Sequence, residues 1–188
     1  MIEETVNGIA LSLTTSENLF SPHRLDRGTR AMLSRVSISP DMKVLDLGCG
    51  AGWVGLYAAH FTEPQNVFMI DIDENAVKCA KENALRCGLN VNAAVSDGFR
   101  DFAEAGFDLI LSNPPYQSDF AVAKHFIEKG FNRLKLGGKM MMVTKRRPWY
   151  ENKLRAIFGG CKVEEIDGYF VFTAEKRSAT YFARKKQP

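Results

Sequence analysis

Cysteine and histidine are scarce in this sequence of 188 residues, and neither is spaced for a metal site. The four cysteines include no Cys-x-x-Cys pair, and the three histidines lie too far apart to form a ligand set or a catalytic pair. The cysteines are Cys49, Cys79, Cys87 and Cys161, and the histidines are His23, His60 and His125. We therefore expect reduced thiols, with neither a disulfide framework nor a bound metal.

Long apolar runs are absent as well. The longest stretch without Asp, Glu, Lys or Arg runs from Leu47 to Thr62 and contains four glycines, so it is too short to cross a bilayer. The sequence begins Met1-Ile2-Glu3-Glu4, without the basic and then apolar segments of a secretory or transit peptide. We expect a cytoplasmic protein that does not bind membranes.

The composition excludes a fibrous or disordered chain. Hydrophobic residues make up 45% of the sequence and charged residues 25%, which is ordinary for one globular domain. A chain of this length buries about 70% of the surface that its unfolded state exposes, so it needs no covalent staple. No repeat or Pro/Gly/Ser-rich linker divides it, and we expect a single domain over residues 1–188, with an N-terminal extension (1–40) and a core (41–188).

The net charge of +3 is unevenly distributed along the chain. Residues 1–94 hold 8 basic and 11 acidic residues, whereas residues 95–188 hold 17 and 11. Two short basic runs, 145–147 and 184–186, account for much of the difference. Such runs suit a polyanionic partner, or they form a solvated face and a frayed tail.

From residue 43 onward, short apolar runs alternate with longer segments of helical periodicity. This alternation predicts βαβ units and a mainly parallel sheet with helices on both faces. The predicted strands are Lys43 to Leu47, Val67 to Ile72, Val91 to Val95, Phe107 to Ser112 and Lys139 to Thr144, the last holding Met140 to Met142 in the core. Strand character recurs at Lys162 to Ile166, Tyr169 to Thr173 and Thr180 to Ala183, of which two would form an antiparallel hairpin that closes the sheet.

Helical periodicity marks three segments between these strands. The predicted helices are Glu74 to Arg86, Asp119 to Leu136 and Tyr150 to Phe158. The second is expected to end at Gly137-Gly138, since glycine readily adopts the left-handed conformation that caps a helix.

The glycine-rich segment from Val44 to Gly55 is the most informative part of the sequence. A strand leads into a Gly-x-Gly-x-Gly turn, with Gly48 and Gly50 placed to let the backbone approach a ligand closely. Asp71 follows Gly52 by 19 residues, the distance at which a carboxylate binds the hydroxyls of an adenosine ribose. The alternative is a tight turn without a ligand.

Two further acidic residues point to the kind of cofactor. Asp46 at the end of the first strand would repel a pyrophosphate and favour a cationic group, so S-adenosylmethionine is preferred over a nicotinamide dinucleotide. Asp97, in Ser96-Asp97-Gly98 after the third strand, could accept from the amino group of adenine, although Asp-Gly also favours simple turns.

The loop Ser112-Asn113-Pro114-Pro115-Tyr116 after the fourth strand predicts the chemistry. Its two prolines stiffen the loop and remove two backbone donors. The side-chain carbonyl of Asn113 and the backbone carbonyl of Pro114 could hold the hydrogens of an exocyclic amino group while its lone pair faces a methyl donor. Tyr116 would offer a face on which a planar substrate stacks. A turn that merely ends a strand is the alternative.

These motifs together resemble class I S-adenosylmethionine-dependent methyltransferases of the Asn-Pro-Pro-Tyr/Phe type, which methylate amino groups. With Leu19-Phe20-Ser21 and the segment from Leu25 to Thr29, the chain is similar to the small-methyltransferase-domain family, which includes ribosomal RNA small-subunit guanine-N2 methyltransferases. The resemblance implies an α/β, Rossmann-like class I methyltransferase fold with a mainly parallel seven-stranded sheet, helices on both faces and a C-terminal antiparallel hairpin.

The resemblance also assigns roles to residues. It implies cofactor binding by Asp46, Gly48, Gly50, Asp71, Asp97 and Asn113, and target-amine binding by Asn113, Pro114 and Tyr116. Thr29 either borders the cofactor or caps a helix over Arg30 to Val36. We expect the chain to depart from the larger ribosomal RNA enzymes in lacking their additional N-terminal domain, and it has Tyr116 where many have Phe.

The leading hypothesis is an enzyme that methylates an exocyclic amino group of a base in RNA, with guanine N2 of ribosomal RNA favoured. S-adenosylmethionine would be the cofactor and S-adenosylhomocysteine the product. Partners would be ribosomal RNA or a ribosomal particle, with phosphate contacts from Arg24, Arg27, Arg146 and Arg147, each of which could equally be a solvated surface charge. The alternatives are a protein glutamine N-methyltransferase, a non-catalytic cofactor- or RNA-binding protein, and a nicotinamide oxidoreductase.

Overall fold

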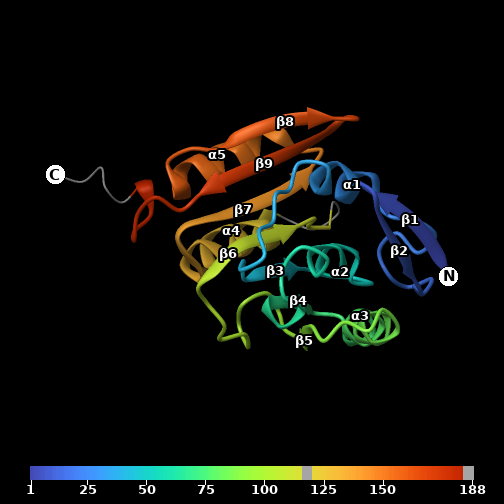
Figure 1. Cartoon of the computed structure of the whole chain (residues 1–188). Helices are drawn as coiled ribbons and strands as arrows, with labels where there is room; N and C mark the ends of the chain where they lie inside the picture. The colour runs from blue at the N-terminus through green and yellow to red at the C-terminus, as the bar shows by residue number, and fades with distance from the viewer. Residues whose placement is uncertain (116–119, 184–188) are drawn as a thin grey trace.

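A computed structural model of the chain describes residues 1–115 and 120–183. Its centre is a seven-stranded sheet in the order β5-β4-β3-β6-β7-β9-β8, which Figure 1 shows from β8 at the top to β5 at the bottom. The pairs from β5 to β7 are parallel, and β9 is antiparallel to both β7 and β8. This is the predicted class I methyltransferase architecture, with its C-terminal antiparallel hairpin.

The sheet strands lie close to their predicted positions. They are β3 (Val44–Leu47), β4 (Val67–Asp71), β5 (Asn92–Val95), β6 (Phe107–Ser112), β7 (Leu134–Thr144), β8 (Lys162–Ile166) and β9 (Tyr169–Glu175). Met140, Met141 and Met142 of β7 are buried, as predicted.

Helices cover both faces of this sheet. The helices are α1 (Arg27–Leu33), α2 (Trp53–Ala58), α3 (Glu74–Arg86), α4 (Phe120–Arg133) and α5 (Arg147–Phe158), with a 3-10 turn, η1, at Pro64–Asn66. One core cluster joins α1, α2 and α3 to the sheet, and a second joins α4 and α5 to it. Side chains alternate between the two clusters along a strand, with Leu109 and Leu111 in the first and Ile110 in the second.

The N-terminal extension contains a β-hairpin that the sequence analysis did not predict. Strands β1 (Ile2–Val6) and β2 (Ile9–Leu13) pair antiparallel across the two-residue turn Asn7-Gly8, and both turn residues have positive φ. The hairpin buries Leu11 and Leu13 in the cluster that includes α2. The Asn7 amide also donates to the Leu33 carbonyl and the Tyr57 hydroxyl, each at 2.9 Å. The extension is thus packed onto the core.

The predicted end of the second helix was wrong. Helix α4 ends at Arg133 and not at Leu136, because Leu134 is buried and already pairs with Phe107 of β6. The Lys176 ammonium donates to the Leu134 carbonyl at 2.7 Å, and the Gly137 N–H donates to the Lys176 carbonyl at 2.8 Å, so this segment belongs to the sheet.

Residues 180–183 do not form the third candidate strand. The Tyr181 ring packs edge-on against Phe131 of α4 at 5.1 Å, and its hydroxyl donates to the Glu128 carbonyl at 2.9 Å. These contacts direct the segment along α4 and away from the sheet. Within residues 1–115 and 120–183, no helix combines the length and apolar character that a membrane span requires.

Candidate functional site

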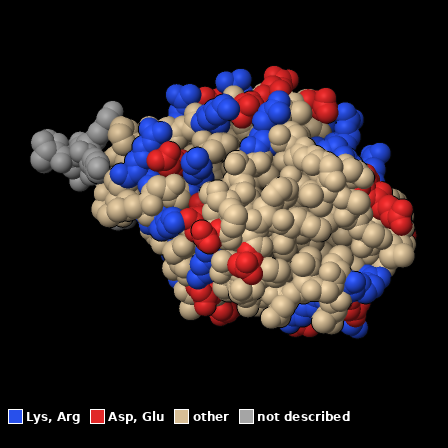
Figure 2. Space-filling view, in the orientation of Figure 1, with Lys and Arg blue, Asp and Glu red and all other residues tan. Residues whose placement is uncertain are grey.

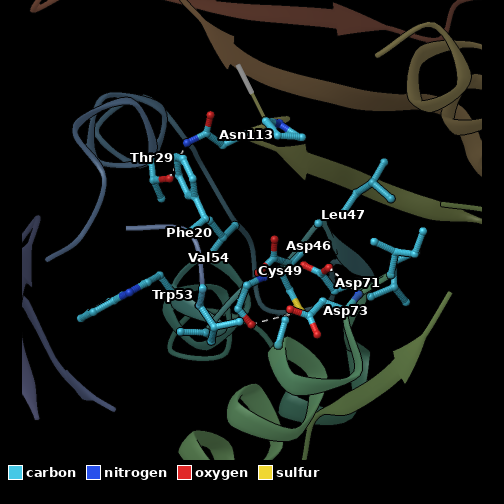
Figure 3. Close-up of a pocket in the computed structure, with 18 of the residues that line it drawn as sticks. Phe20, Thr29, Asp46, Leu47, Cys49, Trp53, Val54, Asp71, Asp73 and Asn113 are labelled. Carbon is cyan, nitrogen blue, oxygen red and sulfur yellow. Dashed lines mark hydrogen bonds between the residues drawn. The ribbon is translucent and has the colours of Figure 1, made fainter. Parts of the chain in front are cut away.

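A cavity of about 300 Å³ opens at the carboxyl ends of β3, β4 and β6. Ligands of open α/β sheets bind at this edge, where the loops after neighbouring parallel strands meet. Figure 3 shows its two ends: Asn113, Thr29 and Phe20 lie together at one, and Asp71 and Asp73 lie at the other. Asp46 and Cys49 lie between them.

The glycine loop forms the floor of this cavity. Gly48, Gly50 and Gly52 all have positive φ (80°, 52° and 93°), a conformation that side-chain-bearing residues rarely adopt. The N–H groups of Gly48 and Cys49 both donate to the Ile70 carbonyl, at 2.9 and 3.0 Å, which ties the loop to β4. A Cβ at Gly52 would lie 3.2 Å from the Ala80 Cβ, so glycine also permits the close packing of α2 on α3.

Asp71 is held in place by the loop on one side and by its own strand end on the other. One carboxylate oxygen accepts from the Gly50 N–H at 2.9 Å, and the other accepts from the Asp73 N–H at 3.0 Å. Each oxygen keeps a further lone pair that can accept a hydrogen bond from a ligand. The spacing of 19 residues from Gly52 therefore does bring this carboxylate to the loop.

Asp46 is a buried carboxylate in the cavity wall, with 2% of its surface exposed. Its pKa is raised to about 7, mainly by burial; a hydrogen bond from the Gly55 N–H at 2.8 Å lowers the pKa, and the nearby Asp71 charge raises it, both within that value. Such a group is costly to ionise unless a positive charge lies nearby. Asp46 thus gives this part of the cavity a preference for cations.

Cys49 also lines the cavity but has no features of a reactive thiol. Burial raises its pKa well above the ordinary value, and the charges of Asp46 and Asp71 act in the same direction. It is 7% exposed and fills space within the loop.

Asp97 reaches the cavity from the loop after β5. It forms an ion pair with Arg100 at 2.7 Å, and its side chain is 44% exposed. The preceding Ser96 is buried and its hydroxyl donates to the Gly98 carbonyl at 2.8 Å, which fixes the turn. Asp97 therefore stands at the rim, able to accept a hydrogen bond from a ligand.

Asn113 has an unusual hydrogen-bonding pattern. Its amide nitrogen donates to Asp26 Oδ2 at 2.8 Å and to Thr29 Oγ1 at 2.9 Å. Its side-chain oxygen, Oδ1, is buried and has no hydrogen-bond partner among the residues that the structure describes. Buried acceptors in native proteins are nearly always paired, so an orphaned one in a cavity wall marks a place for a donor.

The two partners of Asn113 come from the N-terminal extension, 87 and 84 residues earlier. Asp26 caps α1 by accepting from the Thr29 N–H at 2.9 Å, so Thr29 is not the cap and the helix begins at Arg27 and not at Arg30. The alternative of Thr29 as the helix cap was wrong, because the carboxylate of Asp26, three residues earlier, accepts the hydrogen bond from the Thr29 N–H in the first turn. Thr29 itself lines the cavity.

The structure brings most of the predicted site residues to this one cavity. Its lining includes Asp46, Gly48, Gly50, Asp71, Asp97 and Asn113. Pro114 is buried and is not part of the lining, whereas the exposed Pro115 is. Tyr116 lies outside the described residues.

The sequence analysis missed several lining residues. Asp73 was recognisable as a helix cap, and its carboxylate accepts from the Asn75 N–H at 2.8 Å. Val122 and Phe126 lie one turn apart on α4, where the sequence shows only an ordinary apolar face. Ile72 gave no signal beyond its position after Asp71, although it is 66% exposed.

Known proteins similar to this chain were found by sequence. The model of the protein family described as "Methyltransferase small domain" matches residues 10–173 of this chain. The ribosomal RNA small subunit methyltransferase C of Pseudomonas putida (strain GB-1) is 31% identical over 169 residues, which are 87% of this chain and 51% of that protein. The ribosomal RNA large subunit methyltransferase G of Shewanella halifaxensis is 35% identical over 175 residues, covering 86% of this chain and 41% of that protein.

A solved structure has a similar fold. A T. thermophilus 16S rRNA N2 methyltransferase (RsmC), solved in complex with AdoMet and guanosine, superposes with a TM-score of 0.84 at 26% identity. The match covers 93% of this chain and 50% of that one. The chain thus spans about half the length of the curated relatives and of the solved structure that it matches.

Proposed function

This chain belongs to the methyltransferase small domain family, and from that premise we propose that it transfers the methyl group of S-adenosylmethionine to an exocyclic amino group of a base in ribosomal RNA. The observation that carries the proposal is the buried Oδ1 of Asn113, which has no partner within residues 1–115 and 120–183 and lies in the wall of a cavity that can accept such a cofactor. Guanine N2 is the favoured amine, because the T. thermophilus protein of similar fold is a 16S rRNA N2 methyltransferase solved with guanosine.

The residues of the cavity fit the cofactor. Asp71 would accept from the two ribose hydroxyls, Asp97 from the adenine amino group, and Asp46 would face the positive charges of the methionyl end. The positive φ values of Gly48 and Gly50 let the backbone approach the bound molecule without a side chain between them. S-adenosylmethionine, when bound, supplies an electrophilic methyl carbon on a sulfonium.

Asn113 would hold the target amine. Both hydrogens of its own amide are used by Asp26 and Thr29, so the amide cannot rotate and Oδ1 is fixed as an acceptor. An amine N–H that donates to Oδ1 leaves the nitrogen lone pair free to attack. As positive charge develops on that nitrogen, this hydrogen bond becomes stronger, which favours the transition state over the ground state.

No strong general base is required in this proposal. The methylated nitrogen loses its extra proton to water once the bond has formed, and positioning supplies most of the catalysis. The Pro114 carbonyl is proposed as a second acceptor for the amine, and Tyr116 as the face on which the base stacks. As part of this proposal the protein acts on ribosomal RNA or a ribosomal particle in the cytoplasm.

The test is transfer of labelled methyl groups from S-adenosylmethionine to ribosomal RNA, ribosomal subunits and ribosome-free protein extract, each with wild type and Asn113→Ala. We expect label in RNA, identified by nucleoside analysis as a base N-methylated on its exocyclic amino group, and loss of at least about 100-fold in rate in the variant. Label confined to protein, at glutamine, would replace the RNA substrate by a carboxamide. An equal rate in the variant would contradict the role of Asn113.

A further inference from the structure

The same edge of the sheet carries a basic surface beside Asn113. Strands β6 and β7 are parallel, with Ser112 opposite Met142, so Asn113 lies level with Val143, and Lys145 and Arg146 follow two and three residues further along, just past the end of β7. Neighbouring strands lie about 5 Å apart and rise about 3.3 Å per residue, which puts the backbone of Lys145 within roughly 10 Å of Asn113. Both residues are exposed.

A third cation comes from α1, which packs on the face of the sheet opposite α5. Arg27 begins α1 directly after Asp26, the partner of the Asn113 amide, and it is exposed. Helix α1 packs against β7 and β9, and Figure 1 shows it beside the ends of these strands. We define Arg27, Lys145 and Arg146 as the basic rim.

Two members of the basic rim, Lys145 and Arg146, lie over aromatic rings. The Lys145 ammonium lies 4.8 Å from the centre of the Tyr169 ring, and the Arg146 guanidinium lies 5.2 Å from that of Phe120. Phe120 in turn stacks on Trp149, with ring centres 4.4 Å apart and an angle of 19° between the planes. None of the three cations forms an ion pair with a carboxylate among the residues that the structure describes.

Arg147 differs from Lys145 and Arg146 in being paired with a carboxylate. Although it is adjacent in sequence, its guanidinium pairs with Glu151 at 2.9 Å, and it lies over Phe170 at 5.7 Å. Its charge is therefore already compensated, whereas those of Lys145 and Arg146 remain available to an external anion. Cations placed over rings lose less side-chain freedom when they bind a phosphate.

Charge thus changes sign across the edge of the sheet. The carboxyl ends of β3 and β4 carry Asp46 and Asp71, and the ends of β6 and β7 carry Asn113, Lys145 and Arg146. In Figure 2, Lys and Arg atoms gather along the upper rim of the molecule, with acidic side chains among them, above a broad face that has few charges. A polyanion can approach Asn113 from the β7 side without passing the acidic half.

We propose that the basic rim binds the phosphate backbone of RNA on either side of the nucleotide whose base enters the cavity. This inference rests on the proposed function. It adds the path of the RNA strand, which runs over the start of α5 on one side of the cavity and over the start of α1 on the other. Phosphate contacts of this kind position the strand and do not read its sequence.

The test compares binding of deproteinised small-subunit ribosomal RNA by wild type and Lys145→Gln/Arg146→Gln between about 50 and 200 mM salt. The matched control is Lys78→Gln/Lys81→Gln, which removes two exposed charges from α3 at the other edge of the sheet. For the rim variant we expect RNA affinity to fall about tenfold, and the log–log salt slope to fall by about 1.5, because two phosphate contacts are lost. The control should match wild type.

Further variants separate binding from folding and from catalysis. Arg146→Lys keeps the charge, so its log–log salt slope should stay close to that of wild type. Arg27→Gln removes one charge, so its salt slope should be lower than that of wild type by about one. The thermal unfolding midpoint of each variant reports on its folding. At saturating RNA the rim variant should methylate at the wild-type kcat, with a raised KM.

Equal RNA affinity and salt slope in the rim variant and the control would overturn this proposal, even if the wild type methylates RNA. So would a fall in kcat with unchanged KM. If the wild type bound RNA through the rim but transferred no methyl group, the proposed function would fail while the surface would stand.

Discussion

At the scale of one residue, the buried carboxyl of Asp46 lowers the stability of the folded protein near neutral pH, and its charged form favours a bound cation. Its pKa is raised to about 7 from an ordinary value of 3.8, mainly by burial. A carboxyl with a higher pKa in the folded than in the unfolded state binds its proton more tightly when folded. The free energy of unfolding therefore falls as pH rises from about 4 to about 7, and it is level above that range.

We predict that Asp46→Asn removes this pH dependence. Asparagine can still accept from the Gly55 N–H but has no charge to desolvate. In urea unfolding without cofactor, the variant should be more stable than wild type above pH 7, by roughly 2 to 4 kcal/mol, since each pKa unit is worth about 1.4 kcal/mol. The advantage should shrink towards pH 4.

Cofactor binding should change in the opposite sense. Wild-type affinity for S-adenosylmethionine should rise between pH 6 and pH 8 as Asp46 ionises, while Asp46→Asn should bind more weakly and lack this component of the rise. A variant that is less stable than wild type at pH 8, or that keeps the full rise in affinity, would show that Asp46 does not carry this charge.

Sequence reasoning at this scale predicted a residue's position where that position depends on its neighbours in the chain. Asp46 and Asp71 could be placed because each ends a strand that flanks the glycine loop. The locked orientation of Asn113 could not be predicted, because its partners Asp26 and Thr29 lie more than 80 residues away and meet it only through the packing of α1. Hydrogen bonds of this range leave no periodic signal in the sequence.

At the scale of elements, Asn83 of α3 connects three parts of the fold. It is fully buried, and its amide nitrogen donates to the Ala51 carbonyl in the glycine loop at 2.8 Å and to the Thr14 carbonyl after β2 at 2.9 Å. Its side-chain oxygen accepts from the Thr14 N–H at 2.9 Å. Helix α3 therefore holds both the glycine loop and the N-terminal hairpin.

We predict that Asn83→Ala destabilises the protein by about 2 to 4 kcal/mol, because the buried Ala51 carbonyl and the part-buried Thr14 N–H lose their partner. Cofactor affinity should also fall, since the glycine loop loses one of its supports. Urea unfolding and calorimetric titration would measure the two effects. Asn90→Ala, at an exposed position after the helix, is the control and should stay within about 0.5 kcal/mol of wild type. A similarly small effect of Asn83→Ala would contradict the connecting role.

Elements were predictable where a clear period runs between distinct breaks. Helix α3 has its predicted bounds because Asp73 caps its start and its apolar stripe is regular. The β1–β2 hairpin went unpredicted although Asn7-Gly8 is a hairpin turn, because its strands are short and carry Glu3 and Glu4. The start of β7 is set by contacts of Leu134 and Lys176, which local periodicity does not report.

At the scale of the whole molecule, the two halves of one sheet edge differ in charge. Asp46 and Asp71 of the first half of the sequence lie at the ends of β3 and β4, and the basic run 145–147 of the second half follows β7, so part of the uneven charge along the chain becomes a division in space. The reversal of connection between β3 and β6 places the glycine loop and Asn113 side by side. A cationic cofactor and a polyanionic substrate can thus approach from different sides.

The division of this edge into a cofactor half and a target half is the central claim. It is tested most directly by measuring cofactor affinity and methyl-transfer rate together for Asn113→Ala and Asp71→Ala. We predict that Asn113→Ala binds S-adenosylmethionine within a few fold of wild type while its kcat falls by about 100-fold or more, and that Asp71→Ala weakens cofactor binding by about tenfold or more. Loss of cofactor binding in Asn113→Ala, or unchanged affinity in Asp71→Ala, would contradict the account.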